Sequence, residues 1–118
     1  MTKKIWNLFD LQGRTAVVTG GSGVLCGEMA RALGRAGANV VVMARGWEAV
    51  EAVANDIRDE GGKALALACD VLDERALLRA REQIVNHFGG LEILVNGAGG
   101  NHAEATTSAE RTFFDLEI

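Results

Sequence analysis

Residues 16–27 read AVVTGGSGVLCG, and this stretch decides the fold. An apolar run leads into a turn that carries Gly20, Gly21 and Gly23. After the turn, apolar residues recur every three or four positions over 25–36, which predicts an amphipathic helix. A buried strand, a glycine-rich turn and a helix in this order form the start of a strand-helix-strand unit, the building block of α/β proteins.

The same alternation continues along the chain. Apolar runs at 39–43, 64–68 and 92–95 predict three further strands, each covered on both faces as in a parallel sheet. Helical periodicity predicts helices around 50–57 and 77–88. We therefore expect one α/β domain with a doubly wound parallel sheet, of about four strands and three helices. The predicted helix caps, glycines at the C-terminal ends and an aspartate before the third helix, are Gly37, Gly61, Gly62, Gly89, Gly90 and Asp73.

Right-handed crossovers determine where these strands lie in the sheet. They place strands 39–43 and 64–68 on one side of strand 16–19 and strand 92–95 on the other. A crevice then opens at the carboxyl end of strand 16–19. A pyrophosphate in that crevice needs backbone N–H groups at close range, which the glycine turn and the first helical turn offer. Dinucleotide binding is one interpretation, and an ordinary strand-to-helix turn is the other.

The end of the second strand bears on the choice of cofactor. A carboxylate there would normally bind the adenosine ribose, but the chain has Ala44 and then Arg45. Without the repelling acid, and with a guanidinium able to bind a phosphate as a fork, the site favours NADP(H) over NAD(H). A solvated loop position for Arg45 is the alternative.

Polar and flexible residues also follow the last two strands. Asp70 could accept a bond from an adenine amino group while Val71 packs on the ring, or it could simply form a turn. Asn96 offers an amide that could tie neighbouring strands together. The glycines after it leave backbone beside which a nicotinamide ribose could lie, unless the segment is only a flexible loop.

The residues expected to contact the cofactor lie at the carboxyl ends of the predicted strands. Hydroxyl groups come from Thr19 and Ser22. His102, in the loop after Gly100, could bind a sugar-acid carboxylate or be an exposed loop histidine. The full set is Thr19, Gly20, Gly21, Ser22, Gly23, Val24, Leu25, Ala44, Arg45, Asp70, Val71, Asn96, Gly97, Ala98 and Gly99.

Composition narrows the classes of function. The formal net charge of −4 over 118 residues gives no attraction for nucleic acid. No apolar stretch reaches the roughly 20 residues of a membrane span. Cys26 and Cys69 have no metal-ligand spacing, so we expect no metal site and two small buried thiols in a reducing compartment. A cytoplasmic protein without nucleic-acid or membrane partners is expected.

Four segments together resemble the short-chain dehydrogenase/reductase family: LQGR and AVVTG within 11–20, the glycine turn, CDV at 69–71 and LVNGAG at 94–99. Within that family, NGAGGNH at 96–102 followed by ATT at 105–107 is similar to the D-mannonate oxidoreductase (fructuronate reductase) branch. The resemblance implies a Rossmann-type fold and an NAD(P)-dependent oxidoreductase. It also implies a small-molecule substrate, a hydroxyl or carbonyl of a sugar acid or polyol.

Two departures from the family pattern accompany this resemblance. The family's T-G-x-x-x-G-x-G would have glycine at Val24 and Cys26, and the second asparagine of its N-N-A-G is Gly97 here. The family's catalytic Tyr, Lys and Ser come later in its longer domain, so the resemblance assigns no catalytic residue here. We expect residues 1–118 to be an incomplete NAD(P)-binding domain of a homo-oligomeric enzyme. A nucleotide-binding module without catalysis of its own is the alternative.

Overall fold

The computed structural model describes residues 8–99, 107–110 and 112–115. In this part of the chain, four parallel strands form one sheet in the order β3-β2-β1-β4. This confirms the predicted α/β class and the predicted strand order. The strands are β1 (Thr15–Thr19), β2 (Asn39–Ala44), β3 (Lys63–Ala68) and β4 (Ile93–Asn96). The helices are α2 (Val24–Arg35), α3 (Trp47–Asp59) and α4 (Glu74–Phe88), with a 3-10 turn η2 (Phe113–Asp115).

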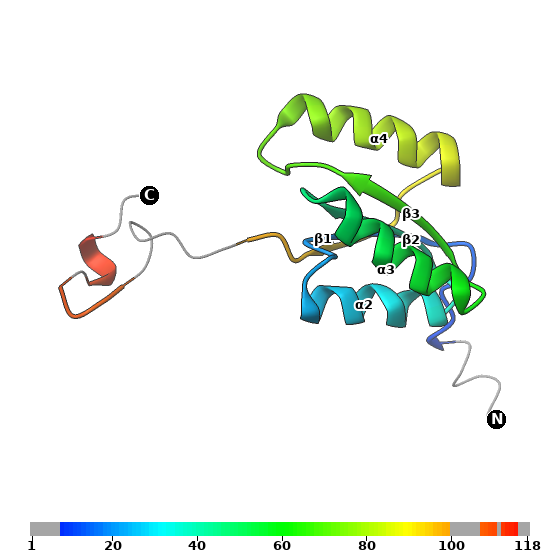
Figure 1. Ribbon diagram of the computed structural model, residues 1–118, viewed down its shortest axis with the longest axis horizontal. Coiled ribbons are helices and arrows are strands. Elements are labelled where there is room, and N and C mark those ends of the chain that lie inside the picture. The colour runs from blue at the N-terminus through cyan, green and yellow to red at the C-terminus, as the bar shows by residue number, and fades with distance from the viewer. Residues whose placement is uncertain (1–7, 100–106, 111, 116–118) are drawn as a thin grey trace.

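The sheet forms the middle of three layers. Helices α2 and α3 lie on one face and α4 lies on the other (Figure 1). Because successive strand residues point to opposite faces, Val18 and Val42 face α2 and α3, while Val17 and Val41 face α4. Both faces of the inner strands are therefore buried, as the continuous apolar runs predict.

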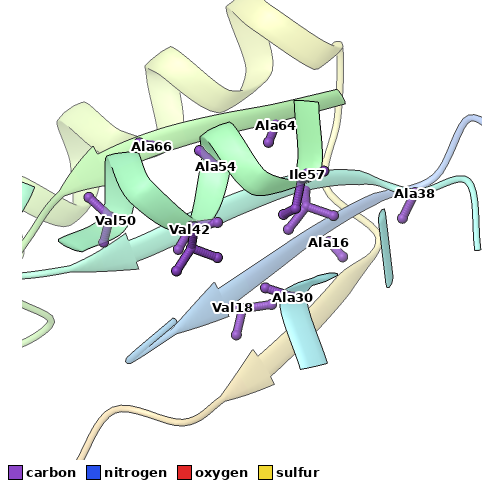
Figure 2. Packing of buried hydrophobic residues seen from close by; sticks show 12 residues of the cluster. Ala16, Val18, Ala30, Ala38, Val42, Val50, Ala54, Ile57, Ala64 and Ala66 are labelled. Atoms are coloured by element: carbon purple, nitrogen blue, oxygen red, sulfur yellow. The ribbon is translucent and has the colours of Figure 1, made fainter. Parts of the chain in front are cut away.

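The core beneath α2 and α3 is built from small and branched side chains. Figure 2 shows Ala30 of α2 beside Val18, and Ile57 of α3 belongs to the same buried cluster. Gly34 belongs to the same packing, since a Cβ atom added there would lie 2.8 Å from a methyl carbon of Ile57. The two helices can thus approach each other closely at this point.

The helix ends follow the predicted caps. Gly37, Gly61 and Gly89 all have positive φ angles, of 98°, 88° and 85°. Asp73 accepts a hydrogen bond from the N–H of Ala76 at 3.2 Å and so caps α4. None of the helices in residues 8–99, 107–110 and 112–115 is long and apolar enough to cross a membrane.

Strand β4 is an edge of the described sheet, and Leu94 at its centre is 57% exposed. An unpaired apolar edge can pair with another chain. We expect the 118-residue chain to self-associate and Leu94→Lys to raise its monomer fraction, because a charge on the edge opposes pairing. Sedimentation velocity over a concentration series measures this.

The control for that measurement is Leu8→Lys. Leu8 is 79% exposed but lies outside the sheet, so its replacement should leave self-association unchanged. Equal monomer fractions for wild type and Leu94→Lys would contradict the role of β4.

Candidate functional site

A cleft of about 870 Å³ opens at the carboxyl ends of the four strands. Its size suits a small organic ligand. It joins the loops after β1, β2, β3 and β4, as the crossover argument predicts. The lining residues are Gly20, Ser22, Gly23, Ala44, Arg45, Gly46, Cys69, Asp70, Val71, Leu72, Gly97, Ala98 and Gly99. Ten of the residues predicted from the sequence are in that set.

The turn after β1 requires glycine for two reasons. Gly20 has a φ of 64°, and a Cβ atom added to it would lie 2.5 Å from the carbonyl oxygen of Gly97. The Gly23 N–H donates to the Gly20 carbonyl at 3.1 Å and closes the turn. A Cβ atom on Gly23 would meet only that carbonyl, at 3.4 Å, so position 23 has room for a side chain as far as the protein itself is concerned.

Gly21 has a different role from the one expected. It is buried, its N–H donates to the Met43 carbonyl at 3.2 Å, and an added Cβ atom would lie 2.7 Å from a methyl carbon of Val42. It therefore packs the turn against β2 and does not line the cleft. The contact of Gly21 with a cofactor therefore stays a prediction, and its N–H already has a partner in the protein.

Helix α2 begins at the cleft with its N-terminal charge uncompensated. Its N-cap, Gly23, makes no side-chain bond, and no acidic residue lies in its first turn. Helix α4, in contrast, has the Asp73 cap and Glu74. The first helical N–H groups and the helix dipole therefore remain available to an anion at α2.

Val24 and Leu25 open that helix, and their side chains do not line the cleft. They are 93% and 70% exposed. What they can offer a ligand is their backbone N–H groups, as predicted, because the N–H of Gly27 is the first to bond back, to the Gly23 carbonyl at 2.7 Å.

The Thr19 hydroxyl connects β1 to the loop after β4. Its Oγ1 donates to the Val95 carbonyl at 3.3 Å and accepts from the N–H groups of Gly97 and Ala98, at 3.0 and 3.1 Å. The Thr19 hydroxyl thus has partners within the protein, and its donation to a cofactor stays a prediction. These bonds correct the role given to Asn96, which is exposed and makes no side-chain bond within the described residues.

Ala44 ends β2 and Arg45 follows it, and both line the cleft, where a 2′-phosphate of NADP(H) is expected. Arg45 is exposed and has no ion-pair partner in the described part of the chain. Arg31 and Arg58, in contrast, pair with Asp56 and Glu51 at 2.8 and 3.1 Å. The Arg45 guanidinium is thus free to receive an anion.

Asp70 combines a turn role with its position at the cleft. Its Oδ1 accepts from the Leu72 N–H at 3.0 Å, and its carbonyl accepts from the N–H of Asp73 at 3.0 Å. The turn interpretation is therefore correct, while the adenine contact stays a prediction. Val71, beside it, is half-buried and packs against the core under α4.

Sequence reasoning missed three lining residues, Gly46, Cys69 and Leu72. Cys69, Gly46 and Leu72 lie one, two and four residues beyond the end of a strand, and their place in the loops after β2 and β3 is the signal that could have identified them. Cys69 is buried, as expected, and burial raises the pKa of its thiol, helped by the negative charges of Asp73 and Asp70. Cys26 is only half-buried, which corrects the expectation of two buried thiols. Gly100 and His102 lie outside the described residues.

Comparisons with known proteins identify the class to which this fold and cleft belong. The family model for short chain dehydrogenases matches residues 14–117. The chain is therefore a member of the short-chain dehydrogenase/reductase family.

Individual relatives agree with this assignment. The chain is 47% identical over 116 residues to an uncharacterized oxidoreductase, UxuB, of Bacillus subtilis, covering 92% of this chain and 42% of the relative. An uncharacterized oxidoreductase of Haemophilus influenzae is 39% identical over 118 residues, covering 92% and 41%. The chain thus spans about two fifths of the length of these relatives.

Two solved structures are similar and hold different cofactors. A Haemophilus protein described as a "putative D-Mannonate oxidoreductase", with bound NAD, has a TM-score of 0.80 and 38% identity over 96% of this chain and 44% of its own. A metagenomic short-chain oxidoreductase in complex with NADP has a TM-score of 0.71 and 36% identity, covering 84% and 47%.

The buried Thr19 hydroxyl gives a prediction. Thr19→Val keeps the shape but leaves the Val95 carbonyl and two N–H groups without their partner. We expect a loss of about 2 kcal/mol in the free energy of unfolding, because three groups lose their partner, although water reaches Gly97 and Ala98. Urea denaturation measures it. Thr19→Ser keeps the hydroxyl and should lose only about 0.8 kcal/mol for the methyl group, so equal losses for both variants would contradict the hydrogen-bond role.

Proposed function

We propose that this chain forms the dinucleotide-binding part of an NAD(P)-dependent oxidoreductase that acts on a hydroxyl or carbonyl group of a sugar acid or polyol. The observation that carries the proposal is the cleft, which brings glycine backbone, an uncapped helix N-terminus and a free guanidinium to one place. When bound, a nicotinamide dinucleotide would supply a hydride donor or acceptor. Membership of the family and the NAD- and NADP-bound relatives support this proposal.

The residues present fit such a cofactor. Gly20 and Gly23 leave the first turn of α2 open, and the N–H groups at its start can bind pyrophosphate oxygens. Gly99 is also free of contacts, since a Cβ atom added there meets nothing within 4 Å. The cleft wall formed by Gly97, Ala98 and Gly99 therefore leaves room for a ribose and a nicotinamide ring. Asp70 and Val71 are proposed to contact adenine at the other end of the cleft.

The preference for NADP(H) is proposed from Ala44 and Arg45. Ala44 presents no carboxylate to repel a 2′-phosphate, and Arg45 has no competing partner within the described residues. Similar proteins hold either NAD or NADP, so the proposed preference rests on the residues of this chain. Binding of NAD(H) is the alternative.

The substrate class comes from one relative, the Haemophilus protein described as a putative D-mannonate oxidoreductase. We extend a D-mannonate or D-fructuronate type of substrate to this chain as part of the proposal. No proton-transferring residue is assigned, because the sequence contains no tyrosine. The two free thiols are consistent with the proposed cytoplasmic location.

Gly23→Val tests the proposal directly. Position 23 has extended backbone and room for a Cβ atom, so the variant should fold, whereas the added side chain would stand where a pyrophosphate must approach. We expect at least about a tenfold weaker binding of NADPH and NADH. Isothermal titration calorimetry measures the binding, and circular dichroism monitors the fold.

The matched control is Gly90→Val, at a half-buried glycine outside the cleft where an added Cβ atom would meet only a Glu92 carboxylate oxygen, at 3.5 Å. It should bind as wild type does. Undiminished binding by Gly23→Val, or no binding by wild type, would contradict the proposed site.

The choice of cofactor has its own test. Arg45→Ala should weaken NADPH binding about tenfold and leave NADH binding nearly unchanged, because a charge-assisted bond contributes about 1.5–3 kcal/mol and an exposed guanidinium lies at the low end. Ala44→Asp should shift the preference toward NADH. Titration of both cofactors measures the ratio of dissociation constants.

Arg14→Ala is the control, because it removes the same charge at the opposite end of β1. It should leave the ratio unchanged. Wild type that binds NADH as tightly as NADPH, or a ratio unaffected by Arg45→Ala, would overturn the proposed preference.

A further inference from the structure

Cys26 and Gly97 lie against each other, although they are far apart in the sequence. A Cβ atom added to Gly97 would overlap Cys26 Sγ and lie 3.3 Å from Cys26 Cβ. The Thr19 carbonyl oxygen would be 2.6 Å away. Two of the three nearest atoms therefore belong to Cys26. The thiol fills part of the volume that a side chain at position 97 would need, and the Thr19 carbonyl occupies another part.

This contact lies between two walls of the cleft. Gly97 lines the cleft, while Cys26 does not. Cys26 belongs to the first turn of α2, the turn with the uncapped N–H groups. The backbone of Gly97 is fixed on its other sides by the Thr19 hydroxyl at 3.0 Å and by close packing of its carbonyl against Gly20. A larger or smaller side chain at position 26 would therefore shift Gly97, which lies in the cleft wall opposite α2.

The two positions also carry the departures from the family pattern described above. That pattern has glycine at 26 and asparagine at 97, and this chain has the side chain at 26 and the glycine at 97. Because the two positions are in contact, the absence of a side chain at 97 makes room for the thiol at 26.

We infer that Cys26 is a positioning residue of the cleft, whose Sγ sets the spacing between the first turn of α2 and the wall formed by Gly97, Ala98 and Gly99. This inference rests on the proposed dinucleotide site. Cys26 acts through Gly97 and does not itself touch the cofactor.

The test is a double-variant cycle of Gly97→Asn, Cys26→Gly and both together. Dissociation constants for NADPH and NADH are measured by titration at a temperature at which circular dichroism shows each variant folded. We expect Gly97→Asn to weaken binding at least about tenfold, and the double variant to recover part of that loss, because residues in contact are coupled. Recovery stays incomplete because the Thr19 carbonyl oxygen, 2.6 Å from a Cβ atom at position 97, still opposes a side chain there. Cys26→Gly alone should lose only a few-fold.

A second series keeps the inference testable if Gly97→Asn does not fold. Cys26→Ser retains the size of the side chain and should bind as wild type does. Cys26→Leu presses on Gly97 and should weaken binding about tenfold, since overpacking shifts the backbone. Gly90→Asn, outside the cleft, is the glycine control and should leave binding unchanged.

The possible outcomes separate the two proposals. Recovery in the double variant, or the contrast between Ser and Leu at position 26, supports the role of Cys26. A second outcome is that wild type binds, that Gly97→Asn binds equally weakly with and without the thiol, and that Cys26→Leu binds normally. This outcome overturns the role of Cys26 but leaves the proposed cofactor site standing. If wild type binds neither dinucleotide, the proposed function falls, and the positioning role falls with it.

Discussion

The close approach of two backbones at the carboxyl end of β1 is the constraint on which the cleft depends. Gly20 turns there with a positive φ, and the carbonyl of Gly97 occupies the space that a side chain at position 20 would need. The Thr19 hydroxyl holds the same approach by three hydrogen bonds. Any side chain at 20 or 97 would push the loops apart, so the glycine turn serves the packing of the protein before it serves a ligand.

The close approach of Gly20 and Gly97 lies at the end of an inner strand of the sheet. Strand β1 lies between β2 and β4, and Thr19 is in register with Met43 on one side and Asn96 on the other. Backbone pairing runs in register from Thr15 opposite Asn39 to Thr19 opposite Met43, and buried apolar residues cover both faces of β1 and β2. The register therefore delivers the ends of the strands to one edge, and the loops that follow them line the cleft.

Much of this arrangement could be predicted from the sequence, because it follows from local patterns. The apolar runs predict the strands, and the crossover rule predicts the strand order. Asp73 caps the start of α4 and Gly89 its end, as expected. The contacts that were not predicted share a different origin. The roles of Thr19, Asn96 and Gly21, and the contact between Cys26 and Gly97, depend on which segments distant in sequence come together. A hydroxyl after an apolar run has the same appearance whether it faces a ligand or a neighbouring strand.

Local arrangement also explains how an acidic chain can offer a site for an anion. The formal net charge is −4, yet Asp70 is the one acidic residue among those that line the cleft, and one of its oxygens is already bonded to the Leu72 N–H. Several other carboxylates pair with arginines on the outer faces of α2 and α3. Charges beyond about 8 Å are screened at physiological ionic strength. An anion in the cleft therefore responds chiefly to Arg45 and the start of α2, where the field is positive.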